Sequence, residues 1–213
     1  MLKLVVVLGC VAASSAFLVN SVGNALTSAL GTFVNGGPPP QTVTELDDAK
    51  YLGRWYQVYS SESVALWFER NAYCVTADYG LGADGRITVL NSDRLGSVNG
   101  SLDVIHGYAT KEDTVGHLNV NLETVPFPAP YWVVKLGPPT YGPNGLYQYS
   151  VVTDNLKATL FVLARDVQTF EEKYEQEVLT FLQEQGFTSF LNKPVKTVHT
   201  KDCVYNNEPG TSA

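Results

Sequence analysis

The residue types that could carry out chemistry are present, but their spacing matches no catalytic or metal-binding pattern. The three histidines, His106, His117 and His199, are scattered and lack the spacing of metal ligands. No Ser-His-Asp arrangement or pair of carboxylates can be identified. An acid role for Asp78 or Asp93 is retained as an alternative, although strand alternation places Asp78 on the outward face. The sequence therefore predicts no catalytic residue, no metal site and no cofactor, and we expect a protein that is not an enzyme.

The first sixteen residues, MLKLVVVLGCVAASSA, indicate a secretory signal peptide. They contain one lysine, an apolar stretch and the small residues Ser14, Ser15 and Ala16, after which we expect cleavage. The alternatives are a short apolar helix, a bacterial lipoprotein signal lipidated at Cys10, and an algal plastid presequence, which the stretch ASSAFL resembles. A signal peptide predicts a secreted, extracellular protein.

Cleavage of this segment would remove Cys10 and leave two cysteines, Cys74 and Cys203. An even number of cysteines in a chain that enters an oxidising compartment predicts a disulfide. In the chain-entropy model, a bond that closes so long a loop stabilises the fold by about 3–5 kcal/mol. Two free, buried thiols are the alternative.

Composition and charge limit the class of protein and its partners. The 213 residues allow one domain with a substantial core or two small ones, and 45% hydrophobic with 16% charged residues is typical of a globular chain. A net charge of −7 without a basic cluster argues against a nucleic-acid partner. Residues 17–45, almost uncharged and rich in proline near their end, are expected to form a flexible leader, and residues 206–213 a disordered tail.

Strand-like runs alternate with turn signals from residue 51 to residue 165. Asp84-Gly85 is a strong hairpin signal between two of them. The eight expected strands are 55–61, 72–81, 86–93, 101–110, 115–123, 131–137, 146–154 and 158–165. Closely spaced strands without a helix-length insert favour a closed antiparallel barrel or a sandwich.

An amphipathic helix is predicted after the last strand, from Thr169 to Gln185. Its apolar residues, at positions 170, 174, 178, 181 and 182, fall on one helical face. Thr169 and Glu172 match a capping box, and Gly186 supplies the end of the helix. The apolar face must therefore pack against the outside of the sheet.

Four stretches resemble the lipocalin family, and within it the apolipoprotein D-like branch. KYLGRWY (50–56) resembles the family's first motif, YCVTADYGLGADGRITVLN (73–91) and APYWVVK (129–135) resemble strands of that branch, and LFVLAR (160–165) resembles the third family motif. The resemblance covers residues 46–205 and implies one all-β lipocalin domain: an eight-stranded antiparallel up-and-down barrel with one C-terminal α-helix packed outside. The family's Thr-Asp-Tyr motif is replaced by LGPPTYGPNGLYQ (136–148), which predicts a remodelled loop at the closed end.

The resemblance gives structural roles to three residues at the closed end of the barrel. It implies that Trp55 lies across this end and that Arg165 covers its indole, a cation–π contact of about 0.5–2 kcal/mol. Gly53 allows a tight turn that a Cβ would obstruct. Ordinary core packing of Trp55 is the alternative, and it too makes the residue structural.

Alternation along the strands selects the side chains that point into the barrel. It groups Ala77 with Tyr79 on one strand and Val89 with Asn91 on the next, and the resemblance makes Tyr79, Asn91 and Phe161 ligand-lining. The full expected set is Ala77, Tyr79, Val89, Asn91, Tyr131, Val152 and Phe161. The assignment of Tyr131 and Val152 depends on the register of the later strands, which the altered loop can shift. Ordinary core packing is the alternative for each aromatic residue.

An apolar, aromatic interior with few polar groups is the usual environment of a small hydrophobic guest. We therefore expect binding and transport of a fatty acid, sterol, retinoid or carotenoid-like molecule. Any carboxylate would lie at the mouth, because no charged residue is expected on an inward face. The alternative is a lipocalin-type enzyme acting on a lipid or carotenoid.

The outer surface carries three further expectations. The resemblance implies lipid handling under oxidative stress and peripheral membrane or lipoprotein contact. Trp132, of opposite parity to Tyr131, is expected outside, where it could belong to such a contact. Asn99-Gly100-Ser101 is a sequon that predicts N-glycosylation of Asn99.

Overall fold

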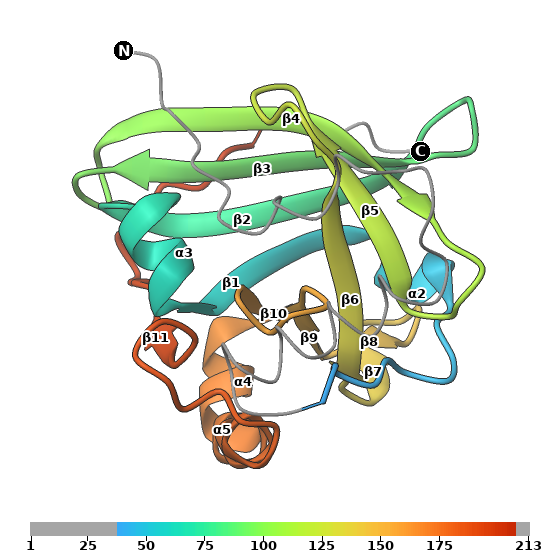
Figure 1. The fold of residues 1–213 in the computed structure, drawn as a ribbon. Coiled ribbons are helices and arrows are strands. Elements are labelled where there is room, and N and C mark those ends of the chain that lie inside the picture. The colour runs from blue at the N-terminus through green and yellow to red at the C-terminus, as the bar shows by residue number, and fades with distance from the viewer. Residues whose placement is uncertain (1–37, 208–213) are drawn as a thin grey trace.

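Eight antiparallel strands form a closed barrel in the computed structural model, which describes residues 38–207 (Figure 1). They are β1 (Gly53–Ser61), β2 (Ala72–Leu81), β3 (Ile87–Leu95), β4 (Ser101–Lys111), β5 (His117–Leu122), β6 (Ala129–Leu136), β9 (Tyr149–Thr153) and β10 (Leu160–Ala164). Each strand pairs with the next in this order, and the ring closes where Tyr56 of β1 pairs with Ala164 of β10. The predicted eight-stranded up-and-down barrel is confirmed.

The connection between β6 and β9 contains a small sheet of its own, β7 (Pro139–Tyr141) and β8 (Leu146–Tyr147). This is the stretch that replaces the Thr-Asp-Tyr motif. The Tyr147 hydroxyl accepts a hydrogen bond from the backbone N of Asp47 at 3.1 Å, immediately before the short helix α2 (Asp48–Tyr51). The remodelled loop is thus tied to the segment that enters β1.

A helical segment follows β10 and packs on the outside of the barrel (Figure 1). It consists of α4 (Val167–Lys173) and α5 (Glu175–Glu184), and the i→i−4 hydrogen bonds continue across Tyr174, which divides them. The predicted capping box is wrong. Asp166 is the N-cap and accepts from the Thr169 backbone N at 2.7 Å, so the helix begins earlier. Gly186, with φ of 85°, ends the segment as predicted.

Alternation divides the apolar side chains between two clusters. The outer cluster joins Val162 of β10 to Phe170, Val178 and Leu182 of the helices, all at most 1% exposed. The inner cluster includes Trp55, Val133, Val152 and Leu163. Burying an aliphatic or aromatic side chain is worth about 1.5–3 kcal/mol, so the outer cluster is sufficient to hold the helices without their entering the barrel.

Strands β1 and β2 separate towards one end of the barrel. Their pairing stops at Tyr56 and Thr76, and the short helix α3 (Glu62–Trp67) connects them beyond that point. The vacated edge of β1 is taken by β11 (Pro194–Lys196), while its other edge stays paired with β10. Just after β11, the backbone N of Thr197 donates to Val58 O and that of Cys74 donates to Val198 O. Residues 194–198 therefore fill the gap between β1 and β2.

Both ends of the described chain contact the barrel. The expected leader, residues 17–45, is described only from residue 38, and there the Val43 backbone N donates to Val133 O at 2.9 Å. At the other end Asn206, the first residue of the expected tail, is 5% exposed. The expected signal peptide, residues 1–16, and residues 208–213 lie outside the described part. Within residues 38–207, no helix has the length and apolar character needed to cross a membrane.

Candidate functional site

Trp55 forms the floor of the barrel interior. Its side chain is fully buried, and its indole N–H donates to Tyr51 O at 2.8 Å. The Arg165 guanidinium carbon lies 3.7 Å from the centre of the indole ring, which is the cation–π contact that the sequence predicts. The closed end is therefore built as expected.

The guanidinium of Arg165 also binds the chain that leads into β1. Four backbone carbonyls of this chain accept hydrogen bonds from Nη1 and Nη2, at 2.7–3.1 Å: those of Lys50, Tyr51, Leu52 and Arg54; Nε donates to a fifth carbonyl, Tyr147 O, at 3.4 Å. Gly53, with φ of 93°, lies so close that an added Cβ would be 3.2 Å from Nη1, which explains the glycine. Burial lowers the pKa of Arg165 to about 10, so it remains a cation at neutral pH.

Five of the seven expected lining residues meet in the inner cluster: Tyr79, Val89, Tyr131, Val152 and Phe161. Ala77, 7% exposed, lies opposite both Trp55 and Asn91 in the strand register. All seven thus belong to the inner wall, and alternation places them correctly. Their contact with a ligand stays a prediction.

Asn91 is the polar member of this set, and its environment is unusual. Its Oδ1 atom is buried and has no hydrogen-bond partner in the described part of the chain. Buried polar atoms are normally paired, by protein or by a bound molecule. The Asn91 amide oxygen is therefore an exception to the usual pairing of buried polar atoms.

A chain of four hydroxyl groups lies beside the Trp55 floor. The Tyr79 hydroxyl is 3.1 Å from that of Tyr131, which is 2.7 Å from that of Tyr51, which in turn is 2.8 Å from Ser150 Oγ. The Tyr51 and Tyr79 rings stack at 5.9 Å, and Tyr79 meets Tyr131 edge-on. Tyr51 and Ser150 were missed by the sequence reasoning: Tyr51 precedes the first expected strand, and Ser150 was not considered although it has the same parity as Val152.

Burial keeps these phenols protonated. It raises the pKa of Tyr51 to about 12, and it raises the pKa values of Tyr79 and Tyr131 well above the ordinary value of 10. The hydroxyl chain is therefore a neutral set of donors and acceptors throughout the physiological range.

One expectation about charge is wrong: acidic residues do lie towards the interior. Gln57, which pairs with the inward Leu163, donates through Nε2 to the Glu69 carboxylate. Asp93 follows Asn91 with the same inward parity and adds to the rise in the pKa of Glu69. Glu69 lies on no strand, in the loop between α3 and β2, so strand alternation could not place it beside Gln57 and Asp93.

Replacing Glu69 by glutamine will make stability less dependent on pH. Burial raises the pKa of Glu69 from 4.5 to about 7, so the folded protein holds this proton more tightly than the unfolded chain does. Its contribution is fully present below about pH 4.5 and is lost as the pH rises through about 7. We therefore compare the free energy of unfolding of Glu69→Gln with that of the wild type at pH 4 and at pH 8. Between these pH values the difference should shift in favour of the variant by about 2 kcal/mol, allowing for the partial exposure of Glu69.

Urea unfolding of both proteins at the two pH values measures this gain. Glu184→Gln, at an exposed position of α5, is the matched control and should differ from the wild type equally at both. An equal difference for Glu69→Gln as well would contradict a buried carboxyl group.

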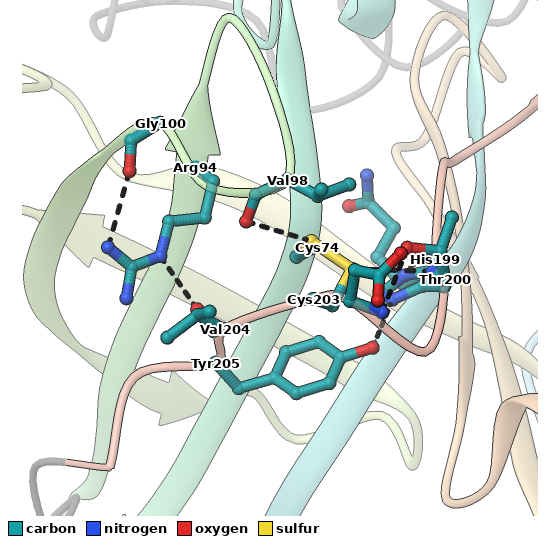
Figure 2. The surroundings of a disulfide bond; sticks show 11 residues. Cys74, Arg94, Val98, Gly100, His199, Thr200, Cys203, Val204 and Tyr205 are labelled. Atoms are coloured by element: carbon teal, nitrogen blue, oxygen red, sulfur yellow. Dashed lines mark hydrogen bonds between the residues drawn. A yellow bond between two sulfur atoms is a disulfide. The ribbon is translucent and has the colours of Figure 1, made fainter.

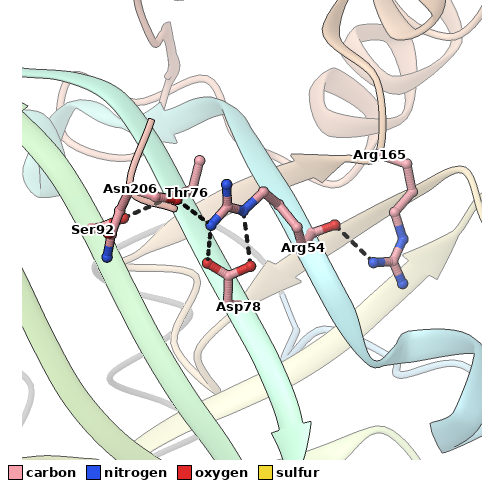
Figure 3. Close-up of polar contacts among 6 residues, drawn as sticks. All are labelled: Arg54, Thr76, Asp78, Ser92, Arg165 and Asn206. Atoms are coloured by element: carbon pink, nitrogen blue, oxygen red, sulfur yellow. Dashed lines mark hydrogen bonds and ion pairs between the residues drawn. The ribbon is translucent and has the colours of Figure 1, made fainter. Parts of the chain in front are cut away.

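The two candidate acids for an enzymatic role lie on opposite faces of the wall. Asp78 faces outward, where both its oxygens bind Arg54, and Arg54 also donates to Asn206 O (Figure 3). Asp93 faces inward near Glu69. Within residues 38–207, no three histidine, cysteine, aspartate or glutamate side chains form a metal-binding group.

Cys74 and Cys203 form a disulfide, and the predicted pairing is confirmed (Figure 2). The bond fixes the segment after β11 to the outer side of β2. In the same segment His199 lies 2.8 Å from Gln57 O and 2.9 Å from the Tyr205 hydroxyl, and burial lowers its pKa. A cysteine held in this way is not a free nucleophile.

Two surface expectations can be placed. Asn99 is exposed in the turn between β3 and β4, and its glycosylation stays a prediction. Trp132 lies on the outer face and stacks on His117 at 3.8 Å. It is only partly exposed, so it does not form an apolar patch by itself.

A model of the lipocalin-like domain matches residues 46–196. The chain is a lipocalin. This lipocalin is 30% identical to temperature-induced lipocalin-1 of Arabidopsis thaliana over 162 residues, 72% of this chain and 81% of the relative. It is 32% identical to mouse apolipoprotein D over 99 residues, which span 46% of this lipocalin and about half (49%) of that protein.

Solved structures share the fold of this lipocalin at low sequence identity. Japanin from Rhipicephalus appendiculatus, bound to cholesterol, superimposes with a TM-score of 0.50 at 14% identity, covering 75% of this chain and 100% of japanin. Lobster apocrustacyanin A1 gives a TM-score of 0.52 at 16% identity, covering 78% and 92%. None of these four proteins has the name of an enzyme.

Proposed function

We propose that this lipocalin binds and carries one small, largely apolar molecule inside its barrel. The observation that carries the proposal is the partial exposure of inward-facing side chains. Trp55 and Val133, on the same inner surface, are 0% exposed, whereas Tyr79, Tyr131 and Phe161 retain accessible surface. An inward side chain that keeps accessible surface borders space inside the barrel or at one of its ends, and an apolar space inside the barrel would favour a hydrophobic guest.

The proposed ligand is a small, mostly apolar lipid: a fatty acid, sterol, retinoid or carotenoid-like molecule. Cholesterol in japanin supports a lipid-like guest in a barrel of this fold. The wall of this lipocalin offers aromatic and aliphatic contacts from several strands, so affinity would come mainly from removing apolar surface from water, about 25 cal/mol per Å² before entropy costs.

Ala77→Phe tests the proposed space directly. Ala77 lies between Trp55 and Asn91 on the inner wall, so a phenyl ring there would occupy the space for a guest. We expect the variant to fold and to bind retinol, followed by fluorescence, at least tenfold more weakly than the wild type. Leu102→Phe, on the outer face of β4, is the control and should bind normally.

The result distinguishes a hollow from a filled barrel. Overpacking a filled core costs about 1–3 kcal/mol, so a variant that loses stability without losing affinity would contradict the proposal. Wild-type protein that binds none of a fatty acid, a sterol or a retinoid would also contradict it.

We further propose that the mouth of the barrel contacts a lipid surface. In an up-and-down barrel α3 and the β3–β4 and β5–β6 connections lie at one end, and there Trp67, Phe68 and Phe127 are 53%, 38% and 54% exposed. With 21 acidic against 14 basic residues, an uncharged surface such as phosphatidylcholine is the suitable partner. Protein that fails to float with phosphatidylcholine vesicles would count against this contact.

The disulfide supports a proposal for the compartment of the protein. A cross-link between Cys74 and Cys203 favours the oxidising secretory pathway, and we propose that the protein is secreted and that Asn99 is glycosylated there. A shift in gel mobility after peptide N-glycosidase treatment of protein from a eukaryotic secretory host checks the glycan. Lipid handling under oxidative stress is the proposed setting, and transport of an oxidation-sensitive lipid is the activity to measure.

A further inference from the structure

Three neighbouring strands extend beyond the floor of the barrel. At the closed end the pairing of β1 with β2 stops at Gly53 and Tyr79, but β2 continues to Leu81, which pairs with Ile87 of β3. Ile87 pairs in turn with Ala109 of β4. Alternate residues of a strand share a face, so this further row points inward as Tyr79 does. The inner face of β2, β3 and β4 therefore continues past the point where β1 begins.

The short helix α2 faces this extension on the side that β1 leaves open. Figure 1 shows α2 and the C-terminal end of β4 at the same end of the barrel. Lys111, the last residue of β4, has the same parity as Ala109 and forms an ion pair with Asp48 of α2. Between α2 and the three strands lies a hollow of about 450 Å³. This volume is within the range of about 300–1,000 Å³ that is typical of small-molecule sites.

The hollow is separate from the space proposed for a guest inside the barrel. Of the seven residues expected to line that space, none borders the hollow. The next inward residue of β2 towards the mouth is Tyr79, whose ring stacks on Tyr51 at 5.9 Å. The Tyr51 ring in turn lies 5.2 Å from that of Trp55. A molecule in the hollow would therefore lie beneath the aromatic floor.

The walls of the hollow are mainly apolar. Hydrocarbon surface comes from one residue of the turn after α2 and from the inward row of the three strands: Leu52, Leu81, Ile87 and Ala109. Leu81 is 53% exposed although its parity points inward. A large apolar side chain that is accessible in a concave surface is a feature of binding sites. The hollow therefore suits the apolar body of a small ligand.

Two cations at the rim indicate the polar group of that ligand. Arg86 and Lys111 line the hollow together with one carboxylate, that of Asp48, in a chain whose net charge is −7. Asp48 accepts one of the three N–H groups of Lys111, and Arg86 binds Asp84 through Nε and Nη2, which leaves Nη1 outside that pair. Both pairs are exposed, and exposed pairs are worth only about 0–1 kcal/mol. An acid group can therefore bind the remaining donors of both cations.

We propose that this hollow is a second binding site, which takes a compact organic acid: an apolar ring system or short chain with one carboxylate or sulfonate group. The apolar body lies against Leu52 and Leu81, and the acid group lies between Arg86 and Lys111. Asp48 repels the acid group and competes with it for Lys111. This site goes beyond the proposed function, because it does not depend on a guest in the barrel.

A matched pair of fluorophores tests the site. 1-Anilinonaphthalene-8-sulfonate carries one sulfonate, and N-phenyl-1-naphthylamine is the same skeleton without it. Both are titrated at pH 7 and low ionic strength into the wild type and into Ala77→Phe, which fills the interior above the floor. In Ala77→Phe we expect one site that binds the sulfonate about fivefold more tightly than the neutral compound.

Filling the hollow should remove this site. Ala49 is exposed on α2 and borders the hollow, so Ala49→Phe should weaken the binding of both fluorophores there at least tenfold. Ala83→Phe is the matched control, because Ala83 is exposed in the β2–β3 hairpin but is not part of the lining. If Ala77→Phe does not fold, Ala49→Phe alone should lower the number of sulfonate molecules bound at saturation by one.

Two further variants separate binding from a structural role of the ion pair. Lys111→Gln should weaken the sulfonate about fivefold and leave the neutral compound unchanged, whereas Asp48→Asn should strengthen the sulfonate severalfold. If the pair only held α2 in place, either variant would weaken both fluorophores.

The failures of the two proposals can be told apart. Sulfonate binding that is lost in Ala77→Phe, or that is equal in Ala49→Phe and the wild type, would overturn the second site and leave binding inside the barrel intact. Wild-type protein that binds no sulfonate would overturn it as well. Sulfonate binding that Ala49→Phe removes, in a protein that binds no fatty acid, sterol or retinoid, would overturn the proposed function and leave the second site.

Discussion

Replacing Cys74 and Cys203 together by serine will lower the free energy of unfolding by about 5 kcal/mol. The bond joins residues 129 apart in the sequence, and in the chain-entropy model a loop of this length restricts the unfolded chain by about that amount. Its loss also releases the segment that fills the gap between β1 and β2. Urea unfolding of the double variant, followed by circular dichroism, gives the value.

The matched control is Ser97→Ala, at an exposed position between β3 and β4, which should leave the unfolding curve unchanged. The single variants should resemble the double one, because either breaks the bond. A double variant within about 1 kcal/mol of the wild type would show that the cross-link does not restrain the unfolded chain as the model requires.

Replacing Arg165 by alanine will cost about 4 kcal/mol of stability. The guanidinium is 3% exposed, lies on the Trp55 ring and satisfies four carbonyl oxygens around the start of β1. Removing it leaves those acceptors without their charged donor in a buried site, the kind of change that costs about 3–5 kcal/mol. Thermal and urea unfolding measure the loss.

Arg165→Lys separates charge from shape. A lysine ammonium keeps the charge, but it lacks the planar fork of donors with which the Arg165 guanidinium reaches several carbonyls at once. We therefore expect Arg165→Lys to lose about 2 kcal/mol of stability. Arg86→Ala removes an arginine from an exposed pair with Asp84 and should change nothing measurable. A small effect of Arg165→Ala would mean that the floor does not depend on this residue.

The barrel and its inner wall could be predicted because strand alternation is a local property. Tyr79 and Val89 point inward together for the same reason that Asp78 points outward, and the register between β2 and β3 preserves this order. The Gly53, Trp55 and Arg165 contacts came from the family resemblance, since nothing in their spacing along the chain reveals that they meet.

The misplaced features are those set by irregular backbone or by distant partners. Glu69 lies in the connection between α3 and β2, where no strand period applies, and Cys74, with φ of 55°, interrupts the regular pairing of β2 with β3 just beyond it. The helix start was predicted at Thr169 because Asp166 was not weighed as a cap. Tyr51 precedes β1 on a four-residue helix, and only the closed barrel brings its hydroxyl to Tyr131.

The segment at residues 194–198 also dictates an order of assembly. These residues are synthesised after all eight barrel strands, so the ring of strands can form on the ribosome while one seam in it is still unfilled. Until they arrive, the second half of β1 presents bare amide and carbonyl groups, an edge that neighbouring nascent chains could pair with. The wall is completed only by this late insertion, and formation of the Cys74–Cys203 bond then makes it permanent.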